Sequence, residues 1–596
     1  MSTPPDPVAA ARERAIAERA KRLREDGVDQ YSLLDGEHER FDRDPWNPHP
    51  APRDPVSEAV DVVILGAGIS GMSCAVELSR LGVESYRIID RAGDVGGTWY
   101  WNRYPGCRCD IESYIYMPYL EETGYIPTER YASAPEIFEH CQQVAEQFDL
   151  YRHALFATHV TGATWLDDQS RWEVATDRGD VIRARFVVAA GGLLFKAKLP
   201  AIEGIDDFEG AMFHTARWDY AVTGGGPGEP MTSLAGMRVG VVGTGATAVQ
   251  VVPELAESGA EVYVFQRTPA AVGVRDNRPT DPEWAASLKP GWQEHRTRNF
   301  TESVTGVQPD EDLVQDGWTD LMWVNTARPG RNESEQAELD RIDFEAMEAI
   351  RQRVDDIVED PELAERLKPW WSKHCKRITF NDEYLPTFNR HNVHLVDTDG
   401  AGVDLITANG PVVGEVEYAL DVLVFASGFE VTTDYTRRLG FDPIGRDGVA
   451  MSERWSDGAH TLHGVLTAEF PNFTMVSIAQ AAPGVNFAHF VGQVSRHIAD
   501  MIAACLESGI VEIEPTVEAE DEWLHRLWAE AAAASSRRYA QACTPSYFNN
   551  EGQMTQLAAR GVTWTGNTLP YADHLADWRA AGFPGTVLRR ETEDTP

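Results

Sequence analysis

Two glycine-rich segments of the chain have the spacing that binds the phosphates of a dinucleotide. The first, "GAGISG", follows an apolar run and places Gly66, Gly68 and Gly71 in G-x-G-x-x-G register. The first glycine permits a tight turn, the second lets a pyrophosphate approach the backbone, and the third lets helix and strand pack closely. The next strand-like run, "YRIID", ends at Asp90, where a carboxylate can bind ribose hydroxyls. This unit therefore predicts strand, turn and helix around one dinucleotide.

A second unit, "GTGATA", repeats the pattern with Gly243, Gly245 and Ala248, an allowed third position. Its following strand-like run, "EVYVFQRTP", ends at Arg267 instead of an acid. A cation at this position suits the 2'-phosphate of NADP. We call the two glycine-rich segments the glycine fingers. The strand after the first finger leads to an acid, Asp90, and the strand after the second leads to a base, Arg267. The fingers therefore predict two different dinucleotides, FAD at the first and NADPH at the second.

Several classes of flavoprotein bind this pair of cofactors. A disulfide reductase also needs two paired cysteines beside the flavin, and Cys107 and Cys109 form a C-x-C spacing that does not suit a redox dithiol. The two fingers by themselves are compatible with electron-transfer reductases, flavin monooxygenases and NADPH-binding redox sensors. The residues between and after the fingers have to discriminate among them.

The segment "FEGAMFHTARWD", between the fingers, resembles the fingerprint of type I Baeyer-Villiger monooxygenases. A second segment, "GGTWYWNRYPGCRCD", is similar to another signature of that family, and the similarity runs from about residue 20 to about residue 580. One departure is Ser427, where the family often has threonine. The matched positions are Phe208, Gly210, His214, Trp218 and Asp219 in the fingerprint, and Gly96, Gly97, Trp99, Tyr104, Pro105, Gly106 and Asp110 in the second signature.

The resemblance implies roles for individual residues. Arg377 would stabilise oxyanion charge on the substrate, with Asp110 as its carboxylate partner. Lys376 would join Arg267 on the 2'-phosphate of NADP. His214 would couple NADP binding to flavin geometry, and a titratable ring could do so. The resemblance also implies flavin-side cofactor contacts at Gly97, Thr98, Trp99, Asp110 and Tyr116.

The family inserts one oxygen atom from O2 next to a ketone carbonyl, with FAD and NADPH, to give an ester or lactone. The flanking segments "RLREDGVDQY" and "TPSYFNNEG" resemble its terpenoid branch, above all the lactone synthases of the pentalenolactone pathway. That likeness implies a tricyclic sesquiterpenoid keto acid, 1-deoxy-11-oxopentalenic acid, as substrate. Two alternatives remain: a flavin monooxygenase that oxygenates nitrogen or sulfur, and an NADPH-flavin reductase without oxygenase activity.

These units predict an α/β fold with two Rossmann-like dinucleotide-binding domains and a helical insertion. We expect an N-terminal arm over residues 1–55 and the first part of the FAD-binding domain over 56–204. The NADP-binding domain would span 205–425, with the helical insertion at about 280–370. The second part of the FAD-binding domain and a C-terminal tail would fill 426–596.

Composition limits the partners of this 596-residue chain. Its 94 acidic residues against 53 basic ones give a formal charge of −41, which repels nucleic acid and anionic membranes. No apolar run reaches the roughly 18 residues of a membrane span, so we expect a cytoplasmic protein. Seven cysteines at irregular spacing indicate reduced thiols and not a disulfide framework. We expect a small-molecule ketone and O2 as substrates and no bound metal. We expect the protein to be a monomer or a homodimer.

Overall fold

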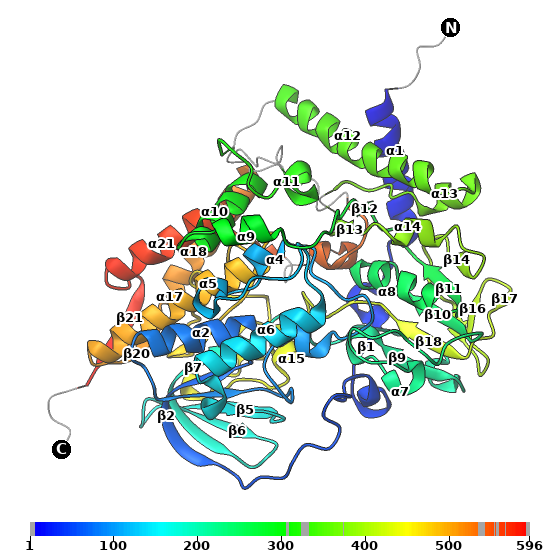
Figure 1. Cartoon of the computed structure of the whole chain (residues 1–596). Helices are drawn as coiled ribbons and strands as arrows, with labels where there is room; N and C mark the ends of the chain where they lie inside the picture. The colour runs from blue at the N-terminus through cyan, green and yellow to red at the C-terminus, as the bar shows by residue number, and fades with distance from the viewer. Residues whose placement is uncertain are drawn as a thin grey trace.

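Two β-sheets rich in parallel strands organise the chain (Figure 1). The computed structural model describes residues 6–305, 309–322, 333–373, 375–533, 543–553, 555, 559–566 and 568–591. Each sheet carries one of the glycine fingers at the carboxyl end of a central strand, where ligands bind in folds of this kind.

The first sheet has the strand order β4-β3-β2-β7-β6-β5, and β19 pairs with β7. β7 pairs antiparallel with β6 over its first half and parallel with β19 over its last residues, so a late part of the chain returns to this sheet. Helix α2 (Ile69–Arg80) of the first finger packs against α17 (Phe487–Glu507). The strands are β2 Ser57–Leu65, β3 Tyr86–Ile89, β4 Ala154–Leu155, β5 Val160–Leu166, β6 Arg171–Thr176, β7 Val181–Ala189 and β19 Phe473–Met475.

The second sheet has the order β14-β11-β10-β18-β9, and all its pairs are parallel. Residues 208–219 have little helix or strand periodicity in the sequence, but Ala211–His214 form the edge strand β9 because they pair with Val422–Phe425. This pairing partner is distant in sequence, so local periodicity could not reveal it. The other strands are β10 Arg238–Val242, β11 Glu261–Gln266, β14 Val393–Asp397 and β18 Val422–Phe425, and helix α8 spans Ala246–Glu257.

A run of helices lies between two short strands, β12 (Val272–Gly273) and β13 (Thr379–Phe380), which pair in parallel. The N-terminal helix α1 (Pro7–Arg22) lies beside α12, where Arg12 forms an ion pair with Asp340 (Figure 1). The helices of this run are α9 Pro282–Ser287, α10 Trp292–Val304, α11 Gly317–Met322, α12 Glu333–Ile357 and α13 Pro361–Leu367.

The remaining elements connect or flank the two sheets. In the N-terminal arm, β1 (Tyr31–Ser32) pairs with β8 (Leu199–Pro200), and near the C-terminus β20 (Ile510–Pro515) pairs with β21 (Thr586–Arg590). No helix in the described part of the chain combines the length and apolar character of a membrane span. The other elements are η1 Gly27–Gln30, η2 Gly36–Phe41, α3 Thr98–Trp101, α4 Ser113–Tyr116, α5 Leu120–Thr123, α6 Ala134–Gln147, η3 Leu150–His153, η4 Ile205–Asp207, η5 Thr215–Arg217, α7 Tyr220–Thr223, α14 Tyr384–Thr387, β15 Leu405–Ile406, β16 Pro411–Val413, β17 Val416–Glu417, α15 Tyr435–Leu439, η6 Arg446–Gly448, α16 Met451–Arg454, α18 Val517–Ala533, η7 Tyr547–Gly552 and α21 Thr568–Ala580.

The expectation that the cysteines are all reduced was wrong for two of them. Cys375 and Cys543 form a disulfide, with their Cα atoms 5.0 Å apart across a sequence separation of 168. Spacing along the chain could not show this, because only the folded chain brings the two segments together. The other cysteines, including Cys107 and Cys109, are free and buried.

Candidate active site and nucleotide sites

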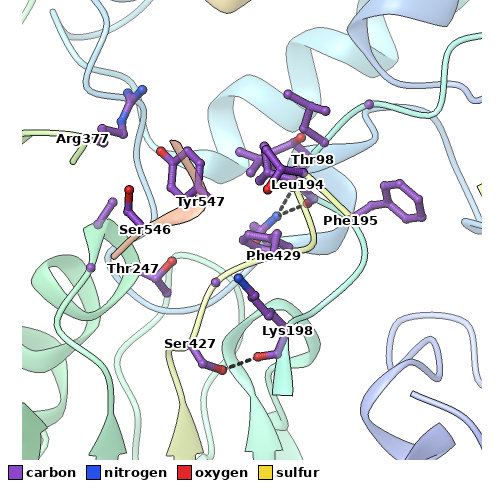
Figure 2. Close-up of a pocket in the computed structure, with 18 of the residues that line it drawn as sticks. Thr98, Leu194, Phe195, Lys198, Thr247, Arg377, Ser427, Phe429, Ser546 and Tyr547 are labelled. Atoms are coloured by element: carbon purple, nitrogen blue, oxygen red, sulfur yellow. Dashed lines mark hydrogen bonds between the residues drawn. The ribbon is translucent and has the colours of Figure 1, made fainter. Parts of the chain in front are cut away.

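Both glycine fingers open into one cavity of about 1470 Å³. Gly66 and Gly68 line it from the first sheet, and Gly243 and Gly245 line it from the second. Arg377 lines the same cavity from the segment that follows the helical run. Figure 2 shows part of this cavity, with Thr98 and Thr247, from the two finger regions, and Arg377 among its lining residues. The predicted cofactor sites and the predicted catalytic arginine therefore share one space.

The first finger has the close backbone approach that a pyrophosphate site requires. A Cβ on Gly71 would lie 1.8 Å from the carbonyl oxygen of Gly66, and a Cβ on Gly97 would lie 2.6 Å from the Cα of Gly68. Gly66 and Gly97 also have φ of +113° and +52°, in the region that favours glycine. The backbone at this turn can therefore come close to a phosphate.

Asp90 lies beside the glycine turn of the first finger. Its Oδ2 accepts a hydrogen bond from the Ala67 amide at 2.6 Å, and its Oδ1 accepts one from the Ala92 amide at 2.8 Å. Burial raises the pKa of Asp90 above its ordinary value. Two bonds leave lone pairs free on a carboxylate, so the side chain can still accept hydrogen bonds from ribose hydroxyls.

An aromatic wall stands beside this finger. Thr98 begins the short helix α3, and Trp99 donates a hydrogen bond from Nε1 to the Tyr116 hydroxyl at 3.2 Å. The two rings are perpendicular, with centroids 5.6 Å apart. All three residues line the cavity. Together with the glycines and Asp90, they fit a flavin dinucleotide, whose apolar ring system needs a shaped wall.

The second finger leaves open space at its middle glycine. A Cβ on Gly243 would lie 2.5 Å from the carbonyl oxygen of Ala426, whereas a Cβ on Gly245 would meet no atom within 4 Å. Gly245 lines the cavity, so this space fits a pyrophosphate. Ala248 is fully buried in α8 and does not line the cavity, in keeping with the packing role of the third position.

The cations expected at the NADP 2'-phosphate lie close together. Arg267 donates from Nη1 to Oε1 of Gln30 at 2.5 Å, and Lys376 donates from Nζ to the carbonyl oxygen of Pro545 at 2.8 Å. Burial, followed by the charge of Arg267, lowers the pKa of Lys376 to about 7. A phosphate would relieve the repulsion between the two side chains, so both fit the 2'-phosphate of NADP.

Arg377 and Asp110 form an ion pair. The guanidinium lies over the ring of Trp318, 5.1 Å from its centroid, and Trp318 donates from Nε1 to the backbone oxygen of Asp110 at 2.9 Å. Burial opposes the charged form of Arg377, but the Asp110 carboxylate, with smaller contributions from Tyr547 and Cys109, raises the pKa of Arg377 above its ordinary value. The structure thus holds a permanent cation at the cavity wall between a carboxylate and an aromatic face.

His214 lies at the end of β9 and does not line the cavity. Its Nδ1 accepts a hydrogen bond from the Ala216 amide at 3.1 Å, and its ring packs nearly perpendicular to that of Phe429, with ring centroids 5.8 Å apart. Burial lowers the pKa of His214 to about 3, so the ring is neutral at physiological pH. Its predicted coupling of the two nucleotide sites would therefore act through packing against the Gly428–Phe429 turn, and it stays a prediction.

The other fingerprint residues shape the connection between the sheets. A Cβ on Gly210 would lie 2.4 Å from the Phe208 ring, so glycine is needed where that ring folds back. Trp218 is fully buried and donates from Nε1 to the Thr223 hydroxyl at 3.0 Å. Asp219 caps the short helix α7 by accepting a hydrogen bond from the Ala221 amide at 2.9 Å.

Sequence reasoning missed several residues at these sites. Lys198 and Glu551 form a buried ion pair at 2.8 Å beside Arg267, and Tyr547 lies near Arg377 (Figure 2). Ser427 donates its hydroxyl hydrogen bond to the carbonyl oxygen of Lys198 at 2.5 Å. The signal for Tyr547 and Glu551 was the segment "TPSYFNNEG", which the sequence marked as resembling a branch of the family but to which it assigned no role.

Comparisons with known proteins give the family. A family profile described as pyridine nucleotide-disulphide oxidoreductase matches residues 63–316. The chain is 46% identical over 593 residues to neopentalenolactone D synthase of Streptomyces avermitilis, which covers 98% of this chain and 99% of that protein. It is 45% identical to a Baeyer-Villiger monooxygenase of Stachybotrys chlorohalonatus, over 95% of this chain and 92% of that protein.

Solved structures agree with these sequence relatives. A polycyclic ketone monooxygenase from Thermothelomyces thermophila superimposes with a TM-score of 0.91 at 38% identity, covering 98% of this chain and 99% of that one. A complex of the protein named OTEMO with FAD and NADP superimposes with a TM-score of 0.75 at 28% identity, covering 90% and 100%. The predicted α/β fold and the FAD and NADPH cofactors are thereby confirmed. The chain belongs to the Baeyer-Villiger monooxygenases, NADPH-dependent flavoenzymes that insert one oxygen atom from O2 next to a ketone carbonyl.

Proposed function

We propose that the enzyme converts a polycyclic terpenoid ketone into a lactone, with 1-deoxy-11-oxopentalenic acid as the first candidate substrate. Two findings support this choice: the relative of Streptomyces avermitilis is a neopentalenolactone D synthase, and the Thermothelomyces protein is a polycyclic ketone monooxygenase. Aromatic side chains such as Trp318, Phe487 and Tyr547 line the cavity and would pack against a fused ring system.

The observation that carries the mechanism is the Arg377–Asp110 pair in the cavity that both fingers line. When bound and reduced, FAD would activate O2, which supplies the oxygen atom that is inserted. When the ketone carbonyl is attacked, negative charge develops on its oxygen, and the Arg377 guanidinium would stabilise that charge by hydrogen bonding. Asp110 and Trp318 would hold the guanidinium in place, so the stabilisation needs no rearrangement during the reaction.

Replacement of Arg377 tests this assignment. We expect Arg377→Ala to lose lactone formation by at least about a hundredfold, because it removes the donor to the developing oxyanion. Reduction of the bound flavin by NADPH should persist, with the reducing equivalents released as hydrogen peroxide. Product formation from a panel of polycyclic ketones would be measured by mass spectrometry, alongside NADPH consumption and peroxide release.

A matched control is Arg298→Ala, because Arg298 is an exposed arginine of α10 that pairs only with Glu302 among the described residues. It should keep the wild-type ratio of lactone to NADPH consumed. If Arg377→Ala formed lactone at a near-normal rate, the proposed role of Arg377 would be wrong, although the family membership would stand.

We further propose the predicted domain division, in which residues 56–204 and 426–596, the latter including a C-terminal tail, form the FAD-binding domain around an NADP-binding domain over 205–425. The return of β19 to the first sheet supports this division, because β19 lies at 473–475. We also propose action in the cytoplasm, as a monomer or homodimer, without a nucleic acid or membrane partner. The formal charge of −41 supports the absence of polyanionic partners.

A further inference from the structure

Four distant parts of the chain meet around Arg267. Tyr31 and Gln30 come from the N-terminal arm, Lys198 precedes β8, Lys376 follows the helical run, and Glu551 belongs to η7 near the C-terminus. Arg267 donates to Gln30 Oε1, and Lys198 Nζ lies 3.8 Å from the centroid of the Tyr31 ring. These residues all line the cavity that the fingers share.

Glu551 is a carboxylate placed among cations. Its side chain is 3% exposed, and its Oε1 accepts a hydrogen bond from Lys198 Nζ at 2.8 Å. Its Oε2 lies 3.7 Å from Arg267 Nη2 and has no hydrogen-bond partner among the described residues. Asn550 and Glu551 have φ of +50° and +54°, which is uncommon for residues other than glycine. The loop that carries this carboxylate is therefore left-handed at two successive residues.

The charges at this place are not balanced. Lys198, Arg267 and Lys376 carry three positive charges when protonated, and Glu551 supplies one negative charge. Two further arginines nearby, Arg22 and Arg24, are compensated by ion pairs with acidic residues of their own segment. The uncompensated charge matches a phosphate monoester, which carries about −1.5 to −2 at neutral pH.

We propose that Lys198 is a third cation of the NADP 2'-phosphate site and that Glu551 is its internal counterion. Without nucleotide, Glu551 holds Lys198 and faces Arg267, which keeps both side chains in place despite their repulsion. A 2'-phosphate competes with Glu551 for the same two cations. Selection of NADPH over NADH then rests on Lys198 as well as on Arg267 and Lys376. The inference rests on NADPH use by the enzyme and not on the identity of the ketone.

The same contact links the phosphate site to the catalytic segment. Glu551 lies on the loop 543–553, which contains Tyr547 beside Arg377. Ser546 donates a hydrogen bond from Oγ to the carbonyl oxygen of Cys375 at 2.9 Å, and Lys376 donates one from Nζ to the carbonyl oxygen of Pro545. Release of Glu551 from Lys198 would therefore act on a loop that contacts residues on both sides of Lys376.

Binding of 2',5'-ADP to the flavin-loaded enzyme tests Lys198 without any turnover. This ligand carries the 2'-phosphate and the adenosine of NADP, and 5'-AMP lacks only the 2'-phosphate. We expect Lys198→Met to weaken 2',5'-ADP binding by about tenfold or more in calorimetry, since a charge-assisted hydrogen bond is lost, and to leave 5'-AMP binding unchanged. The control is Lys196→Met, because Lys196 lies two positions away and donates to the Arg437 carbonyl instead. Wild-type affinity in Lys198→Met would overturn the proposal.

Glu551→Gln provides an independent test, because glutamine has nearly the same shape and no charge. We expect it to bind 2',5'-ADP about threefold to tenfold more tightly, with 5'-AMP affinity unchanged, since the competing charge is gone. Equal or weaker binding of 2',5'-ADP would overturn the counterion role. A wild-type enzyme that did not prefer 2',5'-ADP over 5'-AMP would instead contradict NADPH use, which is a separate result.

Discussion

The position of Arg377 depends on Asp110. The Asp110 side chain is 9% exposed and forms the ion pair with Arg377. The backbone oxygen of Asp110 accepts a hydrogen bond from the indole nitrogen of Trp318. A neutral amide of the same size would keep the packing but lose the charge that holds the guanidinium. Rate losses of about a hundredfold follow displacements of about 1 Å in enzymes.

We therefore expect Asp110→Asn to reduce lactone formation by about a hundredfold while flavin reduction by NADPH continues. The measurement is the ratio of lactone to hydrogen peroxide at equal NADPH consumption. Asp168→Asn, which changes an exposed aspartate in the loop between β5 and β6, is the matched control. Tight coupling of NADPH consumption to lactone in Asp110→Asn would contradict a positioning role for this carboxylate.

Lys376 predicts a pH dependence of nucleotide binding. Burial and Arg267 lower its pKa to about 7 in the protein without nucleotide. A bound 2'-phosphate favours the ammonium and raises this pKa, so binding takes up a proton above pH 7. The affinity for NADP+ should be fully present below about pH 7 and fall by up to about tenfold per pH unit above it.

Titration with NADP+ between about pH 6.5 and about pH 8.5 at constant ionic strength would measure this effect. Lys376→Arg is the control, because an arginine stays protonated over the whole range and should flatten the profile. A wild-type affinity that did not change with pH would show that nucleotide binding does not change the protonation state of Lys376, which would contradict this prediction.

At the scale of elements, the third glycine of the first finger and the middle glycine of the second finger have different surroundings. A Cβ on Gly71 would collide with the carbonyl oxygen of Gly66, whereas a Cβ on Gly245 would meet no protein atom within 4 Å. Gly71→Ala should therefore disrupt the packing of α2 on β2 and yield protein without bound flavin. Gly245→Ala should fold, keep its flavin and bind NADP+ more weakly, because the methyl group would occupy pyrophosphate space.

The flavin absorbance of the purified variants and their affinity for NADP+ separate these two outcomes. Each variant serves as the control for the other, since each replaces one glycine of a finger by alanine and leaves the other finger intact. Full NADP+ affinity in Gly245→Ala would mean that the pyrophosphate does not approach this glycine. A flavin-loaded, stable Gly71→Ala would mean that α2 can shift away from β2 without loss of the site.

At the scale of the whole molecule, the disulfide Cys375–Cys543 joins the end of the helical run to the C-terminal loop. A cross-link across a sequence separation of 168 restricts the unfolded chain strongly. We expect Cys543→Ser to lower the free energy of unfolding by about 2–4 kcal/mol. Denaturant unfolding of the wild type and the variant would measure the difference.

A reductant provides the matched comparison. It should destabilise the wild type to the level of Cys543→Ser and leave the variant unchanged, because the other described cysteines form no disulfide. An equal unfolding free energy for oxidised wild type and Cys543→Ser would contradict a stabilising cross-link.

The nucleotide-binding units could be predicted from the sequence because each is local. Gly66, Gly71 and Asp90 follow one another within a single strand-turn-helix-strand unit. The tight turn requires the two glycines, and Asp90 follows the second strand, where a carboxylate can bind ribose hydroxyls. The choice of Arg267 at the end of β11 likewise indicated NADP. Arg377 and its partner Asp110 came from the resemblance to a family, and the tertiary structure brings the two side chains into contact.

The amino-acid sequence by itself determined the glycine fingers and the two cofactors, since these depend on residue types at fixed short spacings, and its signature segments indicated the family by resemblance. Only the tertiary structure decided which distant side chains meet. The Lys198–Glu551 pair, the Cys375–Cys543 bond and the neutral state of His214 all depend on contacts or burial created by folding. Charge balance and pKa are properties of such surroundings, so no spacing along the chain could have revealed them.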